Sequence, residues 1–181
     1  MAKVTPLLGL SHSLSNADEV RAFLRPHGIT YDRWEISENA RKIASQPVLD
    51  EEAKTALLRC FESELAELAT KEGYVTSDMV CLQPDFEGLA NALANFDREH
   101  YHTDDEVRFI ADGMGVFGFE GEDGRKFIIE VEAGDYIVIP AYRWHWFYMC
   151  SGSGIKAIRI FKDQSGWTPF YKPMAPIEGG N

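Results

Sequence analysis

The chain has 181 residues, 45% of them hydrophobic and 26% charged, which is typical of a globular protein with a full core. Its formal net charge of −11 argues against nucleic acids and anionic membranes as partners, because both need a positive surface. The three cysteines form no Cys-x-x-Cys pair, and no basic N-terminus with an apolar run or membrane-spanning segment is present. We therefore expect free thiols and a cytoplasmic protein.

The first part of the chain carries helix signals. Asn16, with Glu19 three residues later, resembles a capping box that opens a helix to Leu24. Residues 29–36 predict a strand, because they contain Ile, Tyr and Trp. Residues 50–71 predict the clearest helix, with apolar side chains at intervals of three and four: Leu57, Leu58, Phe61, Leu65 and Leu68. We expect this stripe to pack on the outside of the β-barrel that the later strands predict.

The rest of the chain is mainly β in pattern. Residues 74–82 predict a strand, residues 84–96 a second helix, and residues from about 107 short β runs separated by glycines. Glu122-Asp123-Gly124 predicts a hairpin turn. The later strands are expected over residues 127–131, 136–139, 144–149 and 155–161. Together these segments predict a mainly β protein, an antiparallel barrel with helices packed outside.

No internal repeat or long linker divides the chain, so we expect one domain over residues 1–181. Within it, residues 1–73 would form a helical decoration and residues 74–168 the barrel and its site. Residues 169–181 carry prolines and a Gly-Gly pair and predict a loosely held tail.

Residues 100–108 carry the main functional signal, His100-Tyr101-His102-Thr103-Asp104-Asp105-Glu106-Val107-Arg108. On one β-strand, His100, His102, Glu106 and Arg108 would share a face, because side chains alternate. Two imidazoles and a carboxylate can converge on a divalent metal, although a lone His-x-His is more often two half-exposed side chains. Asp104 and Asp105 could be further ligands, but we favour turn formation and hydrogen bonding around the ligands for both.

The spacing around this pair resembles the two motifs of the cupin superfamily. The first motif reads His-x-His-x3-Glu-x6-Gly and ends at Gly113, and the second runs from Gly134 through Pro140 to His145. Three framing residues differ from the usual cupin pattern of two glycines and an asparagine, which indicates a divergent branch: Ala94, Tyr142 and Met149. The stretches that look like the acireductone dioxygenases of methionine salvage are residues 99–110, 113–117, 140–147 and 159–167, with the early Arg33-Trp34.

This resemblance implies a cupin-type barrel that holds one Fe(II) or Ni(II) ion per chain. The ligands it implies are His100, His102, Glu106 and His145. Three imidazoles and a carboxylate leave two of six octahedral positions free, which suits several first-row ions better than a closed tetrahedral zinc site. A chelating substrate could take both positions, and the site charge of about +1 would favour an anionic enediolate.

Two arginines are candidates for stabilising that negative charge. Arg108 shares the ligand face, and a structural pair with Glu106 or Glu99 is an equal alternative. Arg159 is an ionic residue in apolar company on a late strand. The resemblance places both arginines around the ligands and favours a catalytic role for them.

Two aromatic residues are expected to wall the pocket that takes the substrate's thioether tail. These are Phe147, in phase with His145, and Trp167. Plain packing in the core of the barrel is the alternative for both.

The resemblance implies an enzyme, expected to be monomeric, that cleaves acireductone (1,2-dihydroxy-3-keto-5-methylthiopentene) with O2. With iron the products would be formate and 4-methylthio-2-oxobutanoate, the keto acid precursor of methionine. With nickel they would be methylthiopropionate, formate and carbon monoxide. Two other readings stay open, a non-catalytic ligand-binding cupin and a cupin isomerase of sugar phosphates, and oxygen uptake with acireductone separates the three.

Overall fold

The computed structural model describes residues 1–6, 13–85, 88–89, 93–94, 96–121, 123–163 and 168–173. Its helices are α1 (Ala17–Leu24), the 3-10 helix η1 (Arg25–His27), α2 (Glu38–Ala44), α3 (Glu51–Arg59) and α4 (Glu62–Glu72). Its strands are β1 (Lys3–Pro6), β2 (Thr30–Arg33), β3 (Thr76–Leu82), β4 (His100–Tyr101), β5 (Glu106–Glu120), β6 (Lys126–Glu132), β7 (Asp135–Ile139), β8 (His145–Met149), β9 (Ile155–Phe161) and β10 (Phe170–Tyr171). Among the described helices, none has the length and apolar character needed to span a membrane.

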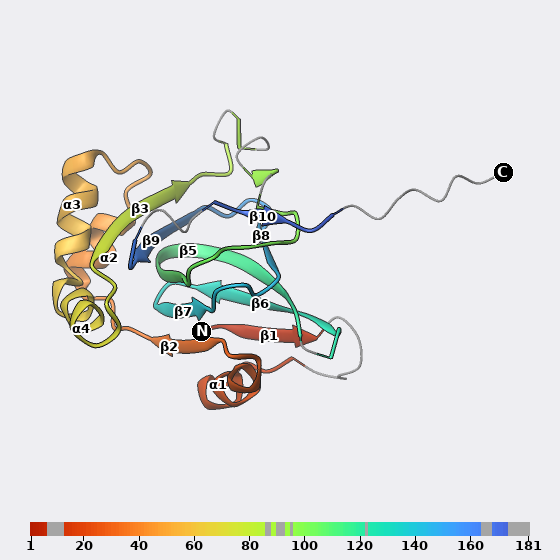
Figure 1. The fold of residues 1–181 in the computed structure, drawn as a ribbon. Helices are drawn as coiled ribbons and strands as arrows, with labels where there is room; N and C mark the ends of the chain where they lie inside the picture. The colour runs from red at the N-terminus through yellow and green to blue at the C-terminus, as the bar shows by residue number, and fades with distance from the viewer. Residues whose placement is uncertain are drawn as a thin grey trace.

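All strand pairs are antiparallel, and β5 belongs to both halves of the fold (Figure 1). The first part of β5 pairs with β7 and β9, and its second part pairs with β6 and β8. One half therefore has the order β1-β6-β5-β8-β4-β10 and the other has the order β2-β7-β5-β9-β3. This arrangement confirms the predicted antiparallel β fold.

Glycines allow β5 to run through both halves. We expected short β runs separated by glycines, but residues 106–120 form one strand of 15 residues. Gly113 follows a bulge against β9 and has φ +78°, and a Cβ there would lie 2.0 Å from the Gly154 carbonyl oxygen. At Gly118, a Cβ would overlap the ring of Trp146. The glycines therefore permit close approach of neighbouring segments of the same chain and do not end the strand.

The core has two parts, one between the two halves of the fold and one under the helices. The inner part includes Phe119, Ile129 and Ile137, all of which are buried. The outer part joins α2, α3 and the α3–α4 junction to the β5–β9 surface, as seen beside β3 and β9 in Figure 1. The predicted packing of the helical stripe on the outside of the sheet is therefore confirmed.

The helix predicted over residues 50–71 is wrong in one respect, because the chain forms two helices with a break at Cys60 and Phe61. Phe61 has φ −119° and ψ 21°, outside the helical region. Its ring is buried, and the ring centroid lies 4.6 Å from that of Phe109 on β5. The break allows Phe61 to reach the sheet, whereas α4 beyond it has no buried residue.

The first helix agrees with its predicted cap. The Asn16 side chain accepts hydrogen bonds from the backbone N–H groups of Asp18 and Glu19, and α1 ends at Leu24. Helix α2 was not predicted; Ser37 caps it, and its buried residues are only Ala40 and Ala44. Such small side chains give a weak periodic signal.

Two predicted segments fall partly outside the described residues. The helix expected over 84–96 includes residues 86, 87, 90–92 and 95, which are not described. The tail expected over 169–181 begins differently, because Phe170 and Tyr171 form β10 and pair with β4. Residues 174–181 lie outside the described part of the chain.

Candidate metal centre

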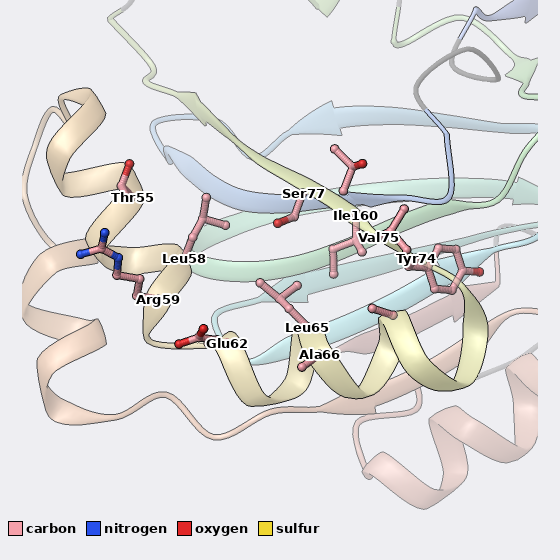
Figure 2. Close-up of a pocket in the computed structure, with 12 residues that line it drawn as sticks. Thr55, Leu58, Arg59, Glu62, Leu65, Ala66, Tyr74, Val75, Ser77 and Ile160 are labelled. Carbon is pink, nitrogen blue, oxygen red and sulfur yellow. The ribbon is translucent and has the colours of Figure 1, made fainter.

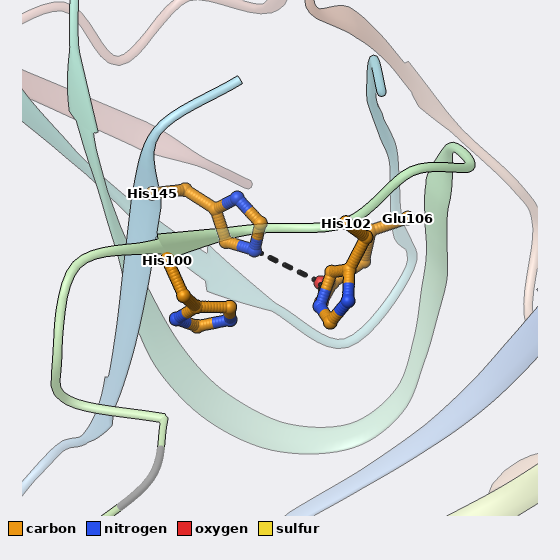
Figure 3. Close-up of side chains that lie close together, drawn as sticks. All are labelled: His100, His102, Glu106 and His145. Atoms are coloured by element: carbon orange, nitrogen blue, oxygen red, sulfur yellow. Dashed lines mark hydrogen bonds and ion pairs between the residues drawn. The ribbon is translucent and has the colours of Figure 1, made fainter. Parts of the chain in front are cut away.

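Four side chains from three strands and one loop lie close together (Figure 3). His100 lies on β4, His102 follows that strand, and Glu106 and His145 begin β5 and β8. One donor atom from each residue lies within 4.8 Å of the others, and all four residues are buried. This spacing is what a single ion between the four donors would require.

Strand pairing brings His145 to the other ligands. His145 is opposite His100 in the β4–β8 pair, with ring centroids 4.4 Å apart. It is also opposite Phe119 in the β5–β8 pair. A residue distant in sequence therefore lies beside the His-x-His segment because β8 is held between β4 and β5.

The single continuous strand expected over residues 100–108 is wrong. Strand β4 ends at Tyr101, residues 102–105 form a loop, and β5 starts at Glu106. The N–H of Tyr142 donates to the His102 carbonyl at 2.8 Å and so ties this loop to the one before β8. His102 therefore reaches the group through the loop, while Glu106 and Arg108 share a face of β5 as expected.

Two histidines have defined tautomers. The Nδ1 atoms of His100 and His145 lie 2.7 and 2.8 Å from the carbonyl oxygens of Arg98 and Arg143. Each Nδ1 therefore carries a proton, which leaves the Nε2 lone pair for an ion. Burial, with a smaller contribution from His145, lowers the pKa of His100 to about 4, so this ring is neutral at pH 7.

The electrostatics of the group fit a divalent cation. One oxygen of Glu106, Oε2, lies 3.0 Å from His145 Nε2 and 3.2 Å from His102 Nε2. Burial alone would raise the pKa of Glu106, but the Arg108 guanidinium beside it holds that pKa well below its usual range. Because Nδ1 of His145 donates to the Arg143 carbonyl, the Nε2 lone pair faces the Glu106 oxygen, and a cation between the two atoms would attract both.

Arg108 lies beside this group and pairs with Glu106 rather than Glu99. Its Nη2 is 3.0 Å from Glu106 Oε1, and the side chain is buried. Burial lowers the pKa of Arg108 to about 10, so the guanidinium remains charged at neutral pH. Glu99 instead forms ion pairs with Lys126 and Lys172.

Arg159 is held by a carboxylate that the sequence did not indicate. Its Nε and Nη2 donate to the two oxygens of Asp78 at 2.6 and 2.5 Å, a bidentate pair. Asp78 and Arg159 are opposite each other in the β3–β9 pair, and Arg159 is also opposite Arg108 in the β5–β9 pair. Both arginines therefore have a structural partner as well as a place near the donor group.

A cavity of about 60 Å³ opens beside Glu106 and the two arginines. Its wall is otherwise apolar and consists of Val80, Leu82, Phe96, Ile110, Phe117, Phe147, Ile155 and Ala157. Phe147 is one of these wall residues, and Trp167 is outside the described residues. The sequence does not indicate that Phe96 or the β3 residues Val80 and Leu82 line this cavity. Residues 74–82 show only a strand pattern.

A larger hollow of about 360 Å³ lies elsewhere, between α3, α4 and the start of β3 (Figure 2). It is lined by apolar side chains such as Leu58 and Leu65, with Arg59 and Glu62 at one side. None of the four donors of the metal group lines it. Its size therefore does not make it the chemical site.

Asp104 and Asp105 are not part of the four-residue donor group. The Asp104 side chain accepts a hydrogen bond from the N–H of Asp105 at 2.8 Å, as in a turn. Asp105 accepts from the N–H of Ala141 and from the hydroxyl of Tyr74. These contacts agree with the predicted turn and supporting hydrogen bonds.

Comparisons with known proteins agree on one family. Residues 26–169 match the model of the ARD/ARD′ family. The chain is 42% identical over 171 residues to an acireductone dioxygenase from Leptospira interrogans, covering 94% of this chain and 96% of that protein. It is 39% identical over 158 residues to one from Bacillus cereus, covering 87% and 93%.

A solved structure agrees with these relatives. It is an acireductone dioxygenase from Bacillus anthracis with a cadmium ion in its active center. The TM-score is 0.88 at 36% identity, with 94% of this chain and 98% of that chain covered. The likeness confirms the predicted cupin-type barrel with outside helices.

Proposed function

Since the chain belongs to the acireductone dioxygenase (ARD/ARD′) family, we propose that it cleaves acireductone with O2 at the metal group of residues 100–145. The observation that carries this proposal is the buried set of three imidazoles and one carboxylate beside a cavity. The related structure from Bacillus anthracis, with cadmium in its active center, supports a divalent ion there. Such a set leaves two octahedral positions for a chelating substrate.

His100, His102, Glu106 and His145 would hold one Fe(II) or Ni(II) ion. When bound, the ion would supply Lewis-acid and redox chemistry that activates the substrate and O2 toward each other. The protein's contribution begins with the charge of the donors. His100 is neutral and Glu106 is anionic, so a divalent ion would keep a net positive charge that favours an anionic enediolate.

Arg108 would hold the negative charge that develops on the substrate's oxygen atoms. Its guanidinium is charged and buried, and it lines the same cavity as Glu106. A fixed cation in a site with little water stabilises such charge more than it would in water. Arg159 lines the cavity too, but Asp78 holds its Nε and one Nη, so we propose that it supports Arg108 and the wall.

The apolar wall would take the methylthio tail of the substrate. Phe147 and Phe117 lie on paired strands with ring centroids 4.9 Å apart, and both line the cavity. Val80 and Leu82 line it from β3. Burying the tail against these side chains would orient the substrate and exclude water from its oxygen atoms. We propose that Trp167 also forms part of the wall around the methylthio tail.

The alternative of a sugar-phosphate isomerase has less support. A phosphate group would need several cations around it, but the described lining of the cavity has two, and Asp78 holds one of them, Arg159, through two hydrogen bonds. The remaining lining of the cavity is apolar. A non-catalytic sensor would not need a buried donor set with open positions.

We propose that the two metal forms give different products, formate and 4-methylthio-2-oxobutanoate with iron, and methylthiopropionate, formate and carbon monoxide with nickel. The reaction would belong to methionine salvage, in a cytoplasmic monomer. The test is to strip the protein of metal, reload it separately with Fe(II) and Ni(II), and measure O2 uptake and carbon monoxide with acireductone. Carbon monoxide from the nickel form alone supports the proposal. Without O2 uptake by either form, the proposed activity is wrong.

A further inference from the structure

The carboxylate of Asp105 lies where two loops of the metal centre meet. Asp105 directly precedes Glu106 and is half-buried. Its Oδ1 accepts the N–H of Ala141 at 3.1 Å, and its Oδ2 accepts the Tyr74 hydroxyl at 2.7 Å and the Lys162 ammonium at 3.2 Å. Three elements far apart in sequence therefore contact one side chain.

Two consecutive amides join the ligand loops. Ala141 N–H donates to Asp105 Oδ1, and Tyr142 N–H donates to the carbonyl of His102 at 2.8 Å. The first loop, residues 102–105, carries His102 and leads to Glu106, and the second, residues 140–144, leads to His145. These two hydrogen bonds therefore join the loop before Glu106 to the loop before His145.

The second loop has a backbone conformation that must be held. Tyr142 has φ 63°, the left-handed region, and is the one non-glycine residue with positive φ in the described part of the chain. This conformation costs a non-glycine residue about 1–2 kcal/mol. Contacts to the first loop must offset that cost, and the Asp105 hydrogen bond is next to the strained residue.

Tyr74 and Lys162 both hold the second carboxylate oxygen of Asp105, Oδ2. The Tyr74 side chain is buried at one end of the hollow in Figure 2, and Lys162 Nζ lies 4.9 Å from its ring centroid. Burial, and the hydrogen bond to Asp105, raise the pKa of Tyr74, so its hydroxyl stays a donor. With Oδ2 bound by Tyr74 and Lys162, Oδ1 accepts the hydrogen bond from Ala141.

We propose that Asp105 is a positioning residue that fixes the loop of His102 and Glu106 against the loop of His145, with Tyr74 orienting its carboxylate. The inference rests on the proposed function only in that the donor group binds a divalent metal. Asp105 itself would not touch the ion. Residues that support ligands in this way typically contribute about 10- to 100-fold to metal affinity.

The test measures the dissociation constant of Ni(II) and Co(II) at 25 °C by competition with a chelator, on folded protein. We expect Asp105→Ala to weaken binding by about 10- to 100-fold. Asp105→Asn should be closer to wild type, because its amide oxygen can still accept from Ala141. Tyr74→Phe should weaken binding by a smaller factor, and adding it to Asp105→Ala should weaken binding no further, since both act through one carboxylate.

The matched control is Asp112→Ala. Asp112 also accepts from a lysine on the β9 side, Lys156, at 2.9 Å, and its position on β5 opposite Lys156 is outside both ligand loops. This variant should lose some thermal stability and keep the wild-type metal affinity. The absorption spectrum of the Co(II) form should change in Asp105→Ala and not in Asp112→Ala, because only the first alters the arrangement of ligands.

Wild-type metal affinity in Asp105→Ala, or equal weakening in Asp112→Ala, would overturn the inference. If Asp105→Ala does not fold, Tyr74→Phe decides the matter, and wild-type affinity in that variant rejects the role. Failure of the proposed function gives a different result, a wild-type protein that binds no divalent metal or binds it without consuming O2.

Discussion

Replacing Arg108 by Met tests whether a buried cation serves the substrate as well as its neighbouring carboxylate. Met keeps most of the apolar length of the side chain but removes the charge. In the structure, Arg108 Nη2 lies 3.0 Å from Glu106 Oε1, and both residues are buried. The substitution therefore leaves a buried carboxylate without its only guanidinium partner among the described residues.

The expected loss in the free energy of unfolding depends on whether metal is bound. Removing one partner of a buried ion pair costs about 3–5 kcal/mol, because the remaining charge is left uncompensated. In the metal-free protein, Arg108→Met should lower the free energy of unfolding by about that amount. In the loaded protein, the divalent ion compensates the charge of Glu106, so the loss should be smaller by about 2 kcal/mol or more.

Lys156→Met is the matched control. Lys156 is a buried cation that donates to Asp112 and to the Ala44 carbonyl, away from the donor group. Its replacement should destabilise the metal-free and loaded forms equally. Urea unfolding of the metal-free and loaded forms of the wild type and of both variants gives the four free-energy differences needed.

Turnover completes the test. Loaded Arg108→Met should keep its metal and lose about 3–4 kcal/mol of transition-state stabilisation, a fall of roughly 100- to 1,000-fold in kcat. Wild-type turnover would refute the substrate role. Equal destabilisation of the metal-free and loaded forms would refute the electrostatic reasoning, and loss of the metal would favour a purely structural pair with Glu106.

Three further predictions follow from the donor group and its loops. His145→Ala should weaken metal binding by more than about 100-fold, beyond the effect of supporting residues, and full metal content by elemental analysis would remove the proposed site. Tyr142→Gly should raise the free energy of unfolding by about 0.5–1 kcal/mol, because relief of left-handed strain exceeds the added freedom of the unfolded chain; a lower melting temperature would contradict this. For His100, the folded pKa of about 4 lies below the ordinary value of 6.5, so the unfolded state binds the proton first as pH falls. The metal-free protein should therefore lose about 3 kcal/mol of stability between those two pH values, with no further loss from His100 below about 4. His100→Gln, measured by urea unfolding across the same range, should lack this slope, and an unchanged slope would show that another group causes it.

The donor residues could be predicted from sequence because their chemistry depends on residue type and spacing. His100, His102, Glu106 and His145 were named from those features together with the family resemblance, and the structure brings their donor atoms within 4.8 Å. The single strand expected to align them is wrong, since the loop over residues 102–105 interrupts it. The residue types indicated the group, but the path of the backbone depended on hydrogen bonds to a distant loop.

Features that depend on contacts between distant residues were not predictable. The helical periodicity runs without interruption through Phe61, whereas in the structure the helix breaks there and the Phe61 ring packs on Phe109. Asp78 gave no signal as the partner of Arg159, 81 residues away. The register of β3 on β9 makes that pair, and a single sequence contains little information about register between strands.

The strands that carry the ligands differ in how firmly they are attached, and this affects how an ion would enter and leave. Strand β5, which begins with Glu106, is hydrogen-bonded to four neighbours along its length, so its amides should exchange with solvent only when the whole protein unfolds. Strand β4, which carries His100, has two residues and short pairs with β8 and β10. Its amides should exchange through small local openings. The ion would therefore be exchanged at the His100 side, at a rate set by the opening of two residues, while Glu106 stays in place.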